Sequence, residues 1–202
     1  MVPGWSAPWR YRARVARLIH LNGPPGIGKS TIARRYVAEH PGVLNCDIDV
    51  LRTLIGGWSE DFAGAGALIR PAALAMIEAY LAHGHDVVLP QMLIDPAQVE
   101  LFESRAVAAG ATYVERFLMD EQEASVQRFG RRGASRPEDP WHDQVRVIVE
   151  RQGGETALVR CWVALEELQA RRPSAQVVPS IEGAPEDTYR LLVESLSRGT
   201  RR

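Results

Sequence analysis

Residues 23–30 read Gly-Pro-Pro-Gly-Ile-Gly-Lys-Ser, which is the pattern G-x-x-x-x-G-K-[ST] of the Walker A phosphate-binding loop. Glycines let the backbone approach phosphate oxygens closely and direct its N–H groups at them. The ammonium group of Lys29 suits the β- and γ-phosphates of a nucleoside triphosphate, and the hydroxyl of Ser30 suits Mg²⁺. The expected nucleotide-binding residues of this segment are Gly23, Gly26, Ile27, Gly28, Lys29, Ser30 and Thr31.

Lys29 is the only lysine of the chain, which has 23 arginines. A coding bias toward arginine would leave a single lysine by chance, whereas a phosphate loop needs a compact ammonium that a planar guanidinium does not replace. The flanking sequence favours the second interpretation. Residues 15–21 form a short apolar run typical of a buried parallel strand, and residues 30–39 have helical spacing.

A second group of polar residues follows the next expected strand, at residues 43–46. Asp47 and Asp49 would lie at the carboxyl end of that strand, where parallel sheets bind ligands, and Arg52 comes three residues later. One carboxylate can hold Mg²⁺ through water, and the other can accept the proton of an attacking hydroxyl. The alternative is an ordinary helix N-cap with an ion pair. After the third strand, Gln91 is a candidate amide for binding an acceptor.

Four arginines fall within nine residues, at Arg128, Arg131, Arg132 and Arg136. Phosphoryl transfer requires positive charge on the moving group and exclusion of water, and a flexible arginine-rich lid supplies both. The alternatives are a solvated basic loop and a groove for nucleic acid. The segment has only one aromatic residue, Phe129, which argues against the groove.

Along the whole chain, short apolar runs alternate with segments whose apolar residues have helical spacing. This alternation predicts a parallel sheet covered by helices on both faces. The glycine-rich segment 56–66 is expected to be a mobile loop. The expected strands cover residues 15–21, 43–46, 86–89, 112–119 and 175–178. The expected helices cover residues 30–39, 50–55, 67–83, 95–109, 120–127, 141–152, 155–171 and 185–197.

The chain has 202 residues, a net charge of −1 and 46% hydrophobic residues. This length favours one domain, which we place at residues 15–198, with an extension at 1–14 and a lid at about 121–152. Two cysteines exclude a disulfide framework and favour a reducing, cytoplasmic setting. No membrane span is expected, and the near-zero net charge gives no general attraction to nucleic acid.

These motifs resemble those of P-loop kinases of the nucleoside-monophosphate-kinase type. Residues 40–52, HPGVLNCDIDVLR, are similar to the segment after the phosphate loop in phage polynucleotide 5′-kinases, and residues 126–133, VQRFGRRG, are similar to their lid. Chloramphenicol phosphotransferase and shikimate kinase have a similar build, and the latter has a comparable D-x-D pair. The resemblance implies a three-layer α/β P-loop NTPase fold with a five-stranded parallel sheet, order 2-3-1-4-5, and an arginine-rich helical lid.

The resemblance also implies roles for individual residues. It aligns Asp49 with the general base, Arg52 with an acceptor-binding arginine, and Arg128 and Arg132 with lid arginines that contact the nucleotide. The candidate catalytic residues are therefore Asp49, Lys29 and Arg132. The candidate acceptor-binding residues are Asp49, Arg52 and Gln91. The candidate metal ligands are Ser30 and, through water, Asp47.

The expected function is transfer of the γ-phosphate of ATP or GTP, with Mg²⁺, to a hydroxyl of a small molecule such as an antibiotic. The alternative is a polynucleotide 5′-hydroxyl kinase. Such kinases have an aspartate at the end of the third strand, where this chain has Leu89-Pro90-Gln91, and this difference argues against a nucleic-acid acceptor. A second alternative is a nucleotide-binding switch without an acceptor, which would hydrolyse nucleotide slowly and tolerate Asp49→Asn.

Lys29→Arg is expected to abolish phosphoryl transfer, although the same exchange is mild at most surface positions. The reason is that a planar guanidinium does not fit the space that the loop leaves for a compact ammonium. The measurement is the rate at which the variant transfers phosphate from the nucleotide. Turnover close to that of the native chain would contradict the role given to the loop.

Overall fold

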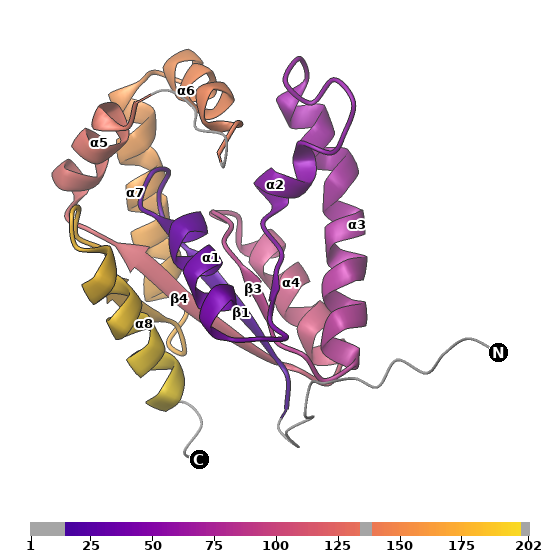
Figure 1. Ribbon diagram of the computed structural model, residues 1–202. Coiled ribbons are helices and arrows are strands. Elements are labelled where there is room, and N and C mark those ends of the chain that lie inside the picture. The colour runs from indigo at the N-terminus through magenta and orange to yellow at the C-terminus, as the bar shows by residue number, and fades with distance from the viewer. Residues whose placement is uncertain (1–14, 134–138, 199–202) are drawn as a thin grey trace.

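A computed structural model describes residues 15–133 and 139–198 of the chain. The expected extension at 1–14 and Arg136 lie outside the described residues. The described strands form one parallel sheet in the order β2-β3-β1-β4-β5, which confirms the expected order (Figure 1). They are β1 (Arg17–Asn22), β2 (Leu44–Asn45), β3 (Val87–Leu89), β4 (Thr112–Met119) and β5 (Gln176–Pro179).

The central strand β1 pairs with β4 along its whole length, from Arg17 beside Thr112 to Asn22 beside Phe117. All residues of β1 after Arg17 are buried, as expected for a strand that has neighbours on both sides and helices on both faces. All carboxyl ends of a parallel sheet meet at one edge, so the segments that leave β1, β2 and β3 converge there. This edge carries the residues that the motifs single out.

Helices cover both faces of the sheet and complete the three layers (Figure 1). On one face lie α1 (Lys29–Glu39) and α8 (Pro185–Arg198). On the other lie α3 (Phe62–Ala82), α4 (Pro96–Ala108) and part of α7 (Glu155–Ala170). A separate hydrophobic cluster on each side of the sheet holds these layers together, because burial of apolar surface is the main driving force for such packing.

A lid formed by α5 (Gln122–Arg131), α6 (His142–Arg151) and the start of α7 stands over the carboxyl edge of the sheet (Figure 1). Helix α7 belongs to both parts, because Leu158 packs within the lid and Leu165 packs in the core below the sheet. The lid is therefore anchored to the core by one continuous helix. The small hydrophobic cluster within the lid consists of the buried residues Phe129, Val149 and Leu158.

Two segments contain more helix than the residue ranges predicted from the sequence. The segment 56–66 consists of turns only as far as Asp61, and α3 begins at Phe62, where the Asp61 side chain caps the helix by accepting from the N–H of Gly64. The arginine-rich segment is helical as far as Arg131, because Phe129 packs into the lid cluster and continues α5.

Helix α3 is long and apolar enough to meet a length-and-composition criterion for a membrane span, with a mean hydropathy of 1.3. It packs the buried side chains of Ala73, Ile77 and Leu81 into the core cluster beneath the sheet. An apolar helix that packs on a sheet meets the same criterion, so this feature is weak evidence for a membrane. The expected absence of a span stays a prediction.

Candidate active site

The phosphate loop connects β1 to α1, and its glycines have backbone conformations that other residues avoid. Gly23, Gly26 and Gly28 have φ angles of 144°, 79° and 108°. A Cβ on Gly23 would lie 2.3 Å from the carbonyl oxygen of Leu118, so β4 leaves no room for a side chain there. Gly28 is the N-cap of α1 and offers no side chain to the free N–H groups of the helix, which stay available for an anion.

The ammonium of Lys29 folds over the loop and donates hydrogen bonds to the carbonyl oxygens of Gly23 and Pro24, at 2.8 and 2.9 Å. Burial lowers the pKa of Lys29 to about 8, although attraction to Asp49 and Asp47 opposes this change. A bound phosphate would supply further negative charge beside the ammonium and restore its preference for the charged form.

Burial raises the pKa of the Asp47 carboxyl to about 6, although the hydroxyl of the neighbouring Ser30 acts in the opposite direction. One oxygen of Asp47 accepts from the N–H of Asp49 at 3.1 Å and caps α2 (Ile48–Arg52). The other, Oδ2, is buried and has no hydrogen-bond partner among the described residues. An unpartnered carboxylate oxygen beside a hydroxyl fits Mg²⁺ bound through water. The described residues contain no cluster of three metal-binding side chains, so phosphates and water would complete its coordination.

Asp49 and Arg52 lie one turn apart on α2 and form an ion pair of 3.1 Å. Burial raises the pKa of the Asp49 carboxyl, while the charges of Arg52 and Lys29 act in the opposite direction. The N-cap and ion pair of the alternative interpretation are therefore both present. They do not exclude a catalytic role, because the carboxylate still faces the same cavity as the phosphate loop.

The guanidinium of Arg52 is held by α3 as well as by Asp49. It lies 3.7 Å above the centre of the Phe62 ring. A Cβ on Gly66 would come within 2.8 Å of its nitrogen Nη2, so the glycine provides the space that the guanidinium occupies. The side chain is buried in this position, and its Nε atom has no hydrogen-bond partner among the described residues.

One cavity of about 240 Å³ joins the phosphate loop, α2, the end of β3 and the lid. Nine of the residues that the sequence predicts line it: Gly26, Gly28, Lys29, Ser30, Thr31, Asp49, Arg52, Gln91 and Arg132. Gly23, Ile27 and Asp47 do not line it. The cavity therefore brings the predicted donor and acceptor groups together in one place.

The lid arginines have separate positions. Arg132 lines the cavity and forms an ion pair of 2.6 Å with the buried carboxylate of Asp139, which also pairs with Arg34 of α1 at 2.9 Å. Arg128 does not line this cavity. It donates to the carbonyl oxygen of Ser180 at 2.7 Å, and its Nη2 lies 3.2 Å from the place where a Cβ on Gly28 would stand.

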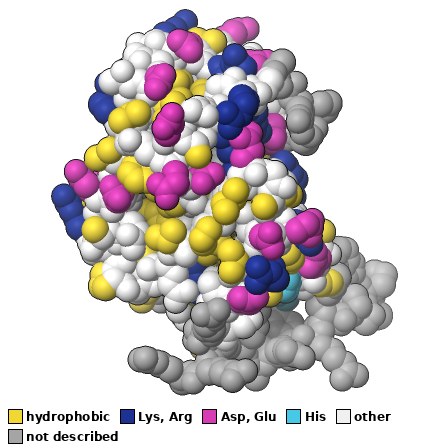
Figure 2. Space-filling view, turned by 90° about the vertical axis from the view of Figure 1, so that its left-hand side faces the viewer, with side chains coloured by type: hydrophobic (Ala, Val, Ile, Leu, Met, Phe, Trp, Pro, Cys, Tyr) yellow, Lys and Arg dark blue, Asp and Glu magenta, His cyan; other side chains and the backbone are white. Residues whose placement is uncertain are grey.

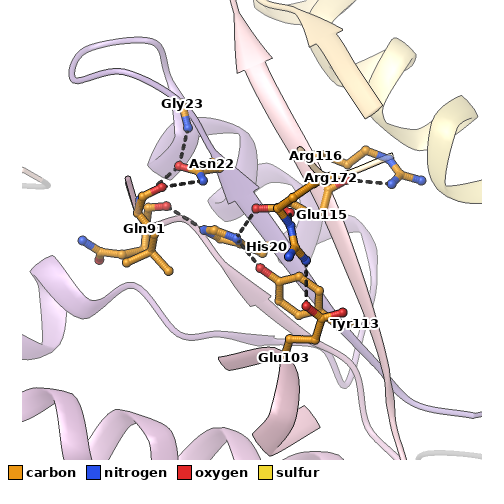
Figure 3. A network of polar contacts seen from close by, with 10 residues as sticks. His20, Asn22, Gly23, Gln91, Glu103, Tyr113, Glu115, Arg116 and Arg172 are labelled. Atoms are coloured by element: carbon orange, nitrogen blue, oxygen red, sulfur yellow. Dashed lines mark hydrogen bonds and ion pairs between the residues drawn. The ribbon is translucent and has the colours of Figure 1, made fainter. Parts of the chain in front are cut away.

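Two residues that the sequence analysis did not single out position the site, as Figure 3 shows. His20 and Asn22 of β1 are fully buried. His20 donates from Nε2 to the backbone carbonyl of Gln91 at 2.8 Å. Asn22 accepts from the N–H of Gly23 at 2.9 Å and from that of Leu93 at 3.1 Å, and donates to the carbonyl of Leu93 at 2.9 Å. Polar residues at alternate positions of a buried strand are the signal that could have found them.

The other ring nitrogen of His20 faces a buried polar network beneath the sheet (Figure 3). Its Nδ1 lies 2.7 Å from the hydroxyl of Tyr113 and 3.3 Å from a carboxylate oxygen of Glu115. Arg172 pairs with this same Glu115 and, at 2.8 Å, with Glu103 of α4. The network fixes the imidazole that holds the Gln91 segment.

A family model described as AAA domain matches residues 18–174 of the chain. This match spans more than half of the sequence, so the chain belongs to that family. The matched residues include the phosphate loop, α2, the end of β3 and the lid.

Two solved structures are similar to this fold. A gluconokinase from Sinorhizobium meliloti 1021 has a TM-score of 0.56 and 20% identity, over 92% of this chain and 94% of that one. A proposed kinase from Chloroflexus aurantiacus J-10-fl has a TM-score of 0.62 and 14% identity, over 94% of this chain and 100% of that one. No curated protein matches the sequence. The chain therefore has the fold of P-loop kinases.

Asn22→Ala is expected to lower the free energy of unfolding by about 3 kcal/mol, because three buried backbone groups lose their partner. Asn45→Ala is the matched control. The side-chain oxygen of Asn45 is buried at the end of β2 without a hydrogen-bond partner, so its removal should change stability by about 0.5 kcal/mol or less. Urea unfolding of both variants measures the difference. Equal effects would show that Asn22 does not hold the loop.

Proposed function

We propose that this protein is a phosphotransferase that moves the γ-phosphate of ATP or GTP to a hydroxyl group of a small molecule. The observation that carries the proposal is the shared cavity, in which Lys29 and Ser30 of the phosphate loop meet the carboxylate of Asp49 and the guanidinium of Arg52. A protein that only binds a nucleotide needs Lys29 and Ser30 alone. A transfer enzyme also needs a base and a group that positions the acceptor.

On the donor side, the N–H groups of the loop and of the α1 N-terminus bind phosphate oxygens. Lys29 leaves the carbonyls of Gly23 and Pro24 to contact the β- and γ-phosphates. Mg²⁺, held by Ser30 and through water by Asp47, would neutralise phosphate charge. Arg128, which lies beside Gly28, would contact the nucleotide from the base of the lid.

On the acceptor side, Asp49 accepts the proton of the attacking hydroxyl. Burial raises its pKa, and this makes the carboxylate a better base than one in water. Arg52 orients Asp49 through their ion pair and lines the cavity on the acceptor side. The side-chain oxygen of Gln91 is buried and has no hydrogen-bond partner in the described part of the chain, so it can accept a hydrogen bond from the acceptor.

Arg132 is the lid group that would stabilise charge on the phosphoryl group in transfer. It lines the cavity but is paired with Asp139, so a phosphate must compete with a buried carboxylate for the guanidinium. Because Asp139 also holds Arg34, the carboxylate keeps a partner when Arg132 turns to the nucleotide. The exchange therefore leaves no buried charge unpaired.

A small molecule is favoured over a polynucleotide as acceptor. At the end of the third strand the chain has Leu89-Pro90-Gln91, where polynucleotide kinases have an aspartate. Figure 2 shows the side of the molecule that carries α5, α7 and α8, where acidic, basic and apolar described side chains are interspersed; α2 and α3 lie on the side turned away from the viewer. The nucleoside-monophosphate-kinase type, a role in antibiotic resistance and a cytoplasmic location remain part of this proposal.

Asp49→Asn is expected to lower kcat by about 100-fold or more, because the amide cannot accept the hydroxyl proton. The affinity for ADP should not change, since the phosphate loop is intact. Transfer of labelled phosphate from ATP to a panel of alcohols measures kcat, and calorimetry measures ADP binding.

The control for this experiment is Glu100→Gln, which neutralises an exposed carboxylate on α4 outside the cavity and should act like the native chain. Normal turnover by Asp49→Asn would contradict the assignment of the base. If ATP were also hydrolysed slowly without any phosphorylated product, the protein would be a nucleotide-binding switch.

A further inference from the structure

The cavity that contains the phosphate loop and Asp49 also has an apolar wall. Its large side chains include those of Phe62 of α3, of Trp141, the N-cap of α6, and of Ile148 of α6. In the described part of the chain, these three residues belong to none of the hydrophobic clusters that form the cores of the sheet and lid. Trp141 is nevertheless only 7% exposed. Large apolar side chains that line a cavity outside any core gain their packing partners when an apolar ligand fills it.

Besides nitrogens of Arg52, two buried polar atoms of residues that line this cavity have no hydrogen-bond partner among the described residues. They are Oε1 of Gln91 and Nε2 of His142, whose residues are 9% and 4% exposed. Buried polar atoms without a partner are rare in folded proteins, because leaving water without a new hydrogen bond costs free energy. These atoms indicate that the ligand carries a small number of polar groups at fixed positions on an apolar body.

The charges around the cavity leave little for an anionic acceptor to bind. Lys29 and Arg132 are the cations on the donor side, where the nucleotide phosphates require them. On the acceptor side the cation is Arg52, which is already paired with Asp49 and covered by Phe62. The next cation, Arg70, does not line this cavity and donates to Gln98 at 2.7 Å. Among the described residues, an anionic group packed against the apolar wall would have no cation beyond the already paired Arg52 to compensate its burial.

We infer that the acceptor is a neutral alcohol with an apolar, ring-sized body, not a sugar acid, a phosphorylated sugar or a polynucleotide. The inference rests on the proposed phosphotransferase function and names the substrate class for it. The apolar body packs between Phe62, Trp141 and Ile148. Its hydroxyl oxygen bonds to the γ-phosphorus as the bond to the departing nucleoside diphosphate breaks, and the hydroxyl proton passes to Asp49.

The test compares three acceptors with the full chain and Mg·ATP: phenylethanol, sodium gluconate and a DNA oligonucleotide with a free 5′-hydroxyl. Mass spectrometry identifies the phosphorylated product, and ADP release gives the rate. We expect kcat/KM to be at least about tenfold higher for phenylethanol than for gluconate, because only the former matches the apolar wall. The oligonucleotide should give no product.

A matched pair of variants tests whether the apolar wall determines the acceptor preference. Ile148→Arg places a cation on the apolar wall, whereas Val147→Arg makes the same change one residue earlier, at a 48% exposed position outside this cavity. Ile148→Arg should lower kcat/KM for phenylethanol by about tenfold, mainly through KM, and raise that for gluconate. ATP hydrolysis without acceptor should not change in Val147→Arg, whose site lies outside this cavity. Val147→Arg should keep the acceptor preference of the native chain.

The outcomes separate this inference from the proposal on which it rests. If the native chain prefers gluconate or the oligonucleotide, or if Ile148→Arg and Val147→Arg behave alike, the acceptor is not a neutral apolar alcohol, although the protein remains a phosphotransferase. If none of the three acceptors is phosphorylated while ADP still forms, both the inference and the proposed function are overturned.

Discussion

The side-chain amide of Asn22 joins the two halves of the site that a phosphotransferase must align. Its oxygen accepts from the first N–H of the phosphate loop and from Leu93, and its nitrogen donates back to Leu93. Two positions earlier on the same face of β1, His20 holds the carbonyl of Gln91. The central strand therefore fixes both the phosphate loop and the segment of Gln91, which border the proposed donor and acceptor sites. A fixed geometry matters because phosphoryl transfer depends mainly on position and electrostatics.

Buried charges of both signs lie close together at the carboxyl edge of the sheet. Burial raises the pKa of Asp47 to about 6 and lowers that of Lys29 to about 8. Burial therefore favours the neutral form of each group. Nucleotide and metal would relieve both effects, because they bring negative phosphates to the lysine and a cation to the aspartate. Within the lid, Asp139 has the corresponding role, since it keeps Arg132 and Arg34 paired until a phosphate competes for Arg132.

Local patterns predicted a large part of this structure. The Walker A motif located the loop, and apolar runs located β4 at residues 112–119 as the structure has it. They could not predict the hydrogen bonds from His20 to Gln91 and from Asn22 to Leu93, because the partners of each bond lie 71 positions apart in the sequence. They also failed at residues 62–66, where glycine suggested that the loop predicted from residue 56 continues. Gly66 is instead helical and leaves space for the Arg52 guanidinium, a requirement that only the packed structure reveals.

The central claim is that the γ-phosphate of a nucleotide and Asp49 meet in one cavity. A crystal structure of the chain with Mg²⁺ and a non-hydrolysable ATP analogue tests it most directly. The account predicts that Lys29 Nζ leaves the carbonyls of Gly23 and Pro24 to contact the γ-phosphate, and that the free side of this phosphate faces Asp49. A nucleotide bound outside residues 23–30, or a γ-phosphate separated from Asp49 by protein, would contradict it.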